Sequence, residues 1–114
     1  AMKSISDRAE VSVDFPDKTY MGSFGRESAF DVKVEPDEVL LRLVRTGAER
    51  REIAVHLHYY LLADLLKEIG RGLEGQDFLD EAHLGALRDG VTALAAAMGK
   101  APRSSPASRK RPRK

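Results

Sequence analysis

Apolar and polar residues alternate along much of the first half of the chain. This period of two occupies four stretches, at residues 10–15, 28–35, 39–45 and 52–57. Such alternation is typical of strands with one buried face. The third stretch is apolar on both sides of Arg42, which indicates a central strand or one that another chain covers. Short turns between the later stretches therefore predict a four-stranded antiparallel β-meander.

One segment between the first two stretches does not fit this pattern. Residues 17–27 contain Gly22 and Gly25, and glycine permits backbone angles that other residues resist. We interpret this segment as a long hairpin connection or an irregular edge.

The apolar period lengthens to three and four residues after the fourth stretch. This stripe comprises Leu61, Leu62, Leu65, Leu66, Ile69 and Leu73. It predicts a helix of about four turns. A second helix is expected after Asp80, a favoured N-cap residue, and its apolar positions continue to Met98. We expect an α+β fold in which the meander is followed by two helices packed on one face of the sheet.

The length of 114 residues allows one domain, which we place at residues 10–99. Residues 1–9 are polar and without period, and we expect them to be flexible. Ala1 before Met2 resembles the remnant of an expression tag. Residues 100–114 contain Pro, Ser, Ala and basic residues but no large apolar residue, so we expect a disordered basic tail.

Composition indicates where the protein is located and which partners to expect. There is no cysteine, which removes disulfides and thiolate metal sites. No apolar run approaches the roughly 18 residues of a membrane span, and the start lacks a signal-peptide core. We therefore expect a cytoplasmic protein with no membrane partner and no cofactor.

Charge is divided unevenly along the chain. Residues 1–100 carry 13 Lys and Arg against 18 Asp and Glu, a net charge of −5, whereas the last fourteen residues carry six cations and no acid. These cations are Arg103, Arg109, Lys110, Arg111, Arg113 and Lys114. Such a run attracts phosphate through counterion release. Because it contains no aromatic residue to stack on bases, we expect nucleic-acid contact without sequence preference, or else a tail that only solubilises.

The second face of the sheet is a candidate interface. The residues that suggest it are Leu40, Arg42, Val44, Tyr20 and Phe24. Exposed apolar groups often mark association, so we expect a homodimer or another protein partner there. The alternative is that residues 17–27 fold over this face within one chain.

Support for catalysis or metal binding is weak. His56 and His58 lie two apart on a strand and would share a face, where Asp31 or Asp14 would complete a borderline metal site. Solvated histidines on a sheet are the simpler interpretation. We therefore expect a non-enzymatic accessory or binding module. The alternatives are a pure protein-interaction module with a solubilising tail, and a metal- or anion-responsive regulator that uses these two histidines and Arg42.

Overall fold

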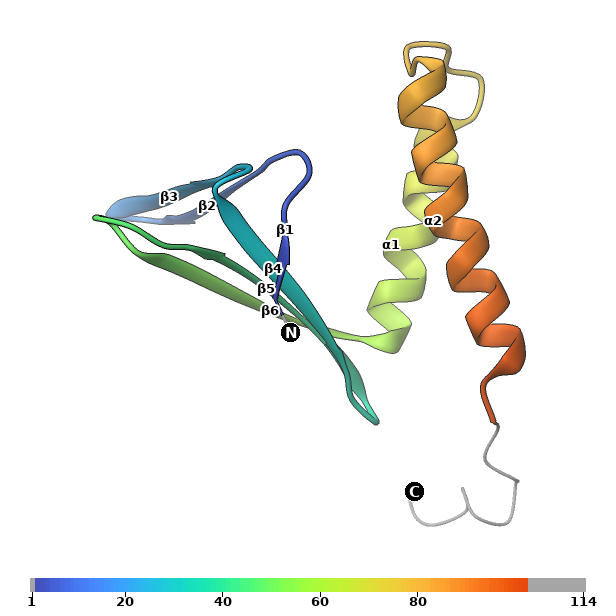
Figure 1. Cartoon of the computed structure of the whole chain (residues 1–114), viewed down its shortest axis with the longest axis horizontal. Helices are drawn as coiled ribbons and strands as arrows, with labels where there is room; N and C mark the ends of the chain where they lie inside the picture. Colours follow the sequence, from blue (N-terminus) through green and yellow to red (C-terminus); the bar gives the residue numbers. More distant parts are fainter. Residues whose placement is uncertain (1, 103–114) are drawn as a thin grey trace. The chain divides into compact units, whose positions relative to one another are not determined.

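The computed structural model describes residues 2–102, which form an α+β structure with a four-stranded antiparallel sheet, a separate two-stranded hairpin and two helices (Figure 1). The predicted fold class is confirmed. The chain divides between Gly72 and Leu73 into two compact units, which are described separately here. The packing of both helices on one sheet face and the single domain at residues 10–99 stay predictions. The tail is predicted to be disordered, but its residues from 103 onward lie outside the described part of the chain.

The four-stranded sheet has the order β1-β4-β5-β6. Its strands are β1 (Lys3–Ser4), β4 (Ser28–Val34), β5 (Glu38–Arg45) and β6 (Arg51–His58). All neighbours are antiparallel, and β5 is central, as its two apolar sides predict. The turn from β5 to β6 contains Gly47, whose φ of 115° is a conformation that favours glycine.

The interpretation of residues 17–27 as a long hairpin connection or an irregular edge was wrong for most of the segment. Most of that segment is β3 (Lys18–Phe24), which pairs with β2 (Ala9–Phe15) in a hairpin that does not join the four-stranded sheet. Pro16 and Asp17 form its tight turn, so Phe15 lies opposite Lys18. Gly22 and Gly25 do not have positive φ, and they fit an ordinary extended strand and its end. The edge position expected for residues 10–15 is held instead by β1.

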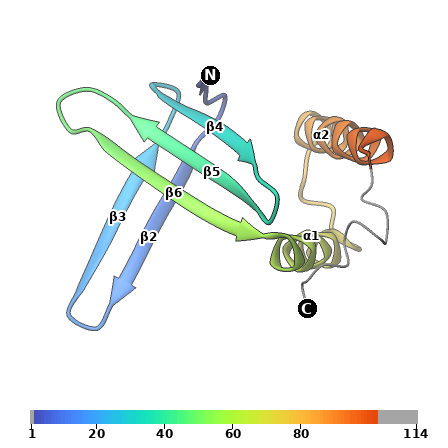
Figure 2. The same cartoon turned by 90° about the horizontal axis from the view of Figure 1, so that it is seen from below.

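The hairpin crosses the four-stranded sheet at an angle (Figure 2). Its inner end is buried, since Phe24 is only 2% exposed, whereas Val13 and Phe15 near its turn are largely exposed. Arg51 of β6 lies over Gly22, where an added Cβ would be 3.8 Å from the arginine Cδ. The hairpin therefore covers the part of the sheet where β6 begins.

Helix α1 (Tyr59–Leu73) follows β6 without an intervening residue. It is followed by a turn at Gly75, which has a φ of 73°. Helix α2 (Glu81–Lys100) begins after Asp80, whose carboxylate accepts a hydrogen bond of 2.9 Å from the backbone N–H of His83. The predicted N-cap is confirmed, and this bond lowers the pKa of the Asp80 carboxyl.

Candidate interaction surface

The strand register gathers the alternating apolar residues of β4, β5 and β6 on one face of the sheet. Phe30, Val32 and Val34 pair with Leu43, Leu41 and Val39. These in turn pair with Ile53, Val55 and Leu57. Because successive side chains of a strand point to opposite faces, all of these side chains project to the same side. We call this side the apolar face.

Within residues 2–72, the hairpin covers only one end of the apolar face. At that end Ile53 and Arg51 line a hollow together with Val11, Val13 and Tyr20 of the hairpin. The hairpin does not reach the end near the turn between β4 and β5. There Val32 is 51% exposed and Val34 is 74% exposed. We call this part the open half; it comprises the exposed residues Val32, Val34 and Val55 and the half-buried residues Val39 and Leu57.

Helix α1 carries a second uncovered apolar surface. No residue of this helix is buried. Its exposed apolar side chains are Leu61, Leu65, Leu66 and Ile69. Their spacing of three and four residues places them in one stripe along the helix. We call these four residues the α1 stripe.

The start of α1 is fixed to the sheet by Tyr59. Its hydroxyl donates hydrogen bonds to the backbone carbonyl oxygens of Glu35, at 2.7 Å, and Glu38, at 3.2 Å. Both carbonyls belong to the turn between β4 and β5, which the Glu35 N–H closes by donating to the Glu38 carbonyl at 2.8 Å. β6 therefore passes directly into a helix whose first residue is held at the end of the sheet (Figure 2).

The opposite face of the sheet is organised around Arg42. Its Nε and Nη2 atoms donate to the two carboxylate oxygens of Asp31 at 3.2 and 3.0 Å, and Nη1 donates to Glu52 at 3.0 Å. The hydrogen bond from Arg42 lowers the pKa of the Asp31 carboxyl, and the same bonds raise the pKa of Arg42. This guanidinium is thus engaged by two carboxylates across three strands, as expected of a structural ion cluster.

The five predicted interface residues do not form one surface. Leu40 and Arg42 line a shallow hollow with Asp31 and Lys33. Val44 and Phe24 are buried, at 9% and 2% exposure, so neither presents a surface to a partner in this conformation. Tyr20 is exposed on the hairpin. Its ring lies edge-on to the ring of Phe15, with 5.9 Å between the two ring centroids. The participation of these residues in an interface stays a prediction.

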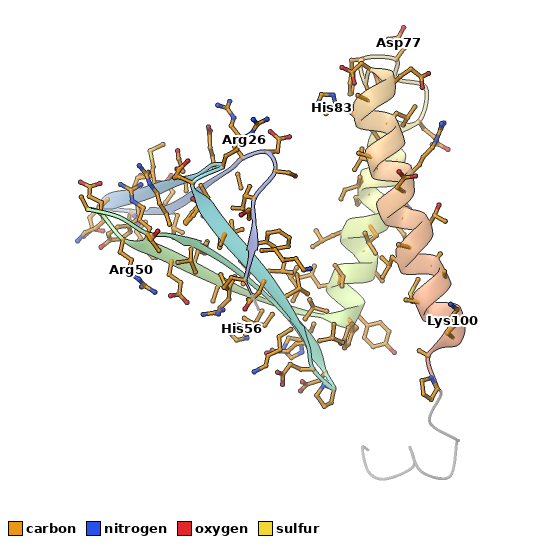
Figure 3. All side chains as sticks on the ribbon, in the orientation of Figure 1. Arg26, Arg50, His56, Asp77, His83 and Lys100 are labelled. Carbon is orange, nitrogen blue, oxygen red and sulfur yellow. The ribbon has the colours of Figure 1, made fainter. Side chains whose placement is uncertain are left out.

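His56 and His58 lie on one face, as their spacing predicts, but neither is paired with Asp31 or Asp14. Both contact Glu38, which is 2.7 Å from His56 Nδ1 and 3.3 Å from His58 Nε2. The two histidine side chains are exposed and Glu38 is half-buried; Figure 3 shows His56 on β6. Within residues 2–102 no group of three or more His, Cys, Asp or Glu side chains is arranged to hold a metal. A metal-responsive role for the two histidines stays a prediction.

The basic residues predicted to contact nucleic acid, Arg103, Arg109, Lys110, Arg111, Arg113 and Lys114, lie outside the described residues. Sequence reasoning missed the open half and the α1 stripe as candidate sites, because a helix stripe and a sheet face are expected to cover each other. The signal that identifies them is the lack of any loop between His58 and Tyr59.

Comparison of the chain with models of known protein families, with curated proteins and with solved structures found no match. None of the helices in the described part of the chain is long and apolar enough to cross a membrane.

Proposed function

We propose that this protein is a non-enzymatic association module with a nucleic-acid anchor. Its folded part binds a protein surface through apolar residues that the chain itself leaves uncovered. Its basic C-terminal segment contacts nucleic acid without sequence preference. We also propose that the protein is cytoplasmic.

The exposed apolar surface of the sheet and of α1 is the observation that supports association with a protein partner. Large uncovered apolar patches on a protein commonly mark sites of association. Here the open half and the α1 stripe provide two such patches, and among the described apolar side chains only Phe24 and Val44 are buried. Residues 2–102 therefore lack a large core of their own, which favours a fold completed by a partner.

The uneven distribution of charge along the chain supports contact with nucleic acid. Six cations occupy the last fourteen residues without a single acid, whereas the preceding hundred residues carry −5. If five or six of these cations neutralise duplex phosphates, the slope of log K against log salt is roughly −4.5 to −5.4. The affinity should then fall roughly 500- to 2,000-fold between about 50 and about 200 mM salt.

Two full-length variants test the anchor. In the first, Gln replaces Arg109, Lys110, Arg111, Arg113 and Lys114. In the matched control, Gln replaces five exposed cations of the folded part, namely Arg8, Lys18, Lys33, Arg50 and Lys67. Both variants change the net charge equally, so a difference between them reports position and not total charge.

Binding to labelled duplex DNA and structured RNA is measured by fluorescence anisotropy at the two salt concentrations. We expect the tail variant to lose the salt-dependent affinity and the control to retain its steep slope. Equal binding by the tail variant and the unaltered protein would contradict the anchor. If none of the three proteins binds, the tail is solubilising and the module acts through protein contacts alone.

A further inference from the structure

The junction between β6 and α1 disfavours contact between the α1 stripe and the open half of the same chain. A helix that packs back on the strand preceding it is usually joined to that strand by two to six residues. Here β6 ends at His58 and α1 begins at Tyr59. The Tyr59 hydroxyl also holds this junction to the turn between β4 and β5. The lack of a connection therefore favours a second chain as the cover for both patches.

We propose that two copies of this chain associate reciprocally, with the α1 stripe of each copy lying on the open half of the apolar face of the other. This inference rests on the associating surface of the proposed function and names its partner. The same two patches are used on both copies, so the interface is isologous and the assembly closes as a dimer.

The dimensions of the two patches agree. Helix α1 has 15 residues, which corresponds to a length of about 22 Å. The three strands of the open half, β4, β5 and β6, span roughly 10 Å between outer backbones, and its residues lie roughly 7 Å apart along β4 and along β6. One helix is therefore long enough to cover the open half diagonally, with the stripe inward.

Both patches retain exposed apolar side chains that a second copy can cover. The stripe residues are 40 to 59% exposed, and Val32, Val34 and Val55 are 37 to 74% exposed. Because the arrangement is reciprocal, each pair of copies buries these side chains twice.

The side of α1 away from the stripe explains why the helix remains soluble in such a pair. It carries Asp64, Lys67, Glu68 and Arg71, which are exposed and of both signs. A helix with one apolar stripe and one charged side buries the former and leaves the latter in water. The helix is thus suited to lie on a partner's sheet as an outer layer.

The mass of the full chain in solution gives the first test. Light scattering coupled to size exclusion should give about 25 kDa, twice the 12.6 kDa of one chain, at about 100 µM. Val34→Asp on the sheet and Leu65→Asp on the stripe should each shift the mass to that of one chain. Met21→Asp should leave the dimer intact, because Met21 is 75% exposed on the hairpin and belongs to neither patch. A monomeric unaltered chain would overturn the inference.

Cross-linking gives the second test and does not depend on disruptive variants. The chain has no cysteine, so Val34→Cys and Leu65→Cys each introduce a single thiol. The two single-thiol proteins, one enlarged by a fused tag, are mixed and treated with a short bismaleimide. We expect the mixed product to form at least tenfold more than either homotypic product.

Other cross-linking results would overturn the reciprocal arrangement. Predominant linking of Leu65→Cys to itself would show that two α1 helices pack together. An intramolecular link in a chain carrying both thiols would show that α1 covers its own sheet. Either result, like a monomeric mass, leaves the nucleic-acid anchor standing, because the anchor is tested separately by the salt-dependent affinity of the tail variant.

Discussion

The hydroxyl of Tyr59 should be a measurable determinant of stability, because it ties the first residue of α1 to the turn between β4 and β5. Tyr59→Phe removes only the oxygen and keeps the ring. The neighbouring Tyr60 offers a matched control, since it is 92% exposed and, among the described residues, its hydroxyl makes no hydrogen bond. Tyr60→Phe therefore makes the same chemical change without the loss of a contact.

The expected magnitude follows from the two acceptors. One hydroxyl proton is shared between the Glu35 carbonyl at 2.7 Å and the Glu38 carbonyl at 3.2 Å, so the loss is that of about one hydrogen bond. A net hydrogen bond is worth about 0.5–1.5 kcal/mol. The penalty should not exceed this range, because Tyr59 is 39% exposed and water can reach the freed carbonyls. We therefore expect a loss of about 1 kcal/mol for Tyr59→Phe and less than about 0.5 kcal/mol for Tyr60→Phe.

Urea unfolding followed by far-ultraviolet circular dichroism measures both variants at one fixed protein concentration. The concentration must be fixed because self-association makes the apparent stability depend on it. In thermal unfolding, each kcal/mol corresponds to a shift in Tm of about 4–8 °C for a domain of 60–100 residues. Equal stabilities of the two Phe variants would refute the hydrogen-bonded junction and remove one of the two reasons for expecting a second chain to cover the open half.

Two further predictions concern a turn and the ion cluster. Gly75→Ala should destabilise the protein by about 1–2 kcal/mol, because Gly75 has a φ of 73°. Gly70→Ala should stabilise the protein by about 0.5–1 kcal/mol, because Gly70 lies inside α1 with open space around it. The urea midpoints of the two variants check both signs. Asp31→Asn should lower the urea midpoint at pH 7, and the difference from the unaltered protein should vanish as the pH falls below 3.8. The sign follows because a depressed carboxyl pKa contributes stability above its ordinary value, and that stability is lost as the carboxyl is protonated. A difference that does not diminish as the pH is lowered from 3.8 would contradict the pairing of Asp31 with Arg42.

Local patterns predicted most of the secondary structure. The period of two identified β4, β5 and β6, and the change to a period of three and four placed α1 after residue 58. Asp80 predicted the start of α2 because N-capping depends on one side chain and the next few backbone N–H groups. These features are decided within a few residues, so one sequence contains them.

The errors came from features that depend on partners distant in the chain. The interpretation of residues 17–27 as a connection or an irregular edge rests on Gly22 and Gly25, which weaken a strand pattern, yet pairing of Tyr20 with Val13 across a two-residue turn makes residues 18–24 a strand. Alternation shows that a strand has an apolar side, but it does not show which other strand lies beside it. Residues 10–15 were therefore expected in the main sheet, and β1, with only two residues, was not predicted.

The candidate interface depends on contacts that no local pattern contains. Leu40 and Val44 beside Arg42 suggest an association surface on the second face; the structure places Arg42 between Asp31 and Glu52 and buries Val44, and association there stays a prediction. The packing of α1 on the first face also stays a prediction. It depends on the connection between β6 and α1, and a boundary at His58 is the kind of detail that sequence patterns place only within a few residues.

Association and nucleic-acid contact are physically compatible in this chain despite its acidic folded part. A segment of fourteen residues can span at most roughly 50 Å, whereas the field of exposed charges is screened within about 8 Å at physiological salt. The cations of the tail can therefore meet phosphates at a distance where the −5 charge of residues 1–100 no longer repels them. A reciprocal dimer would present two such segments to one nucleic acid, and the second would bind from a high effective concentration. Pairing through α1 would thus strengthen an anchor that has no sequence preference without adding any contact to the bases.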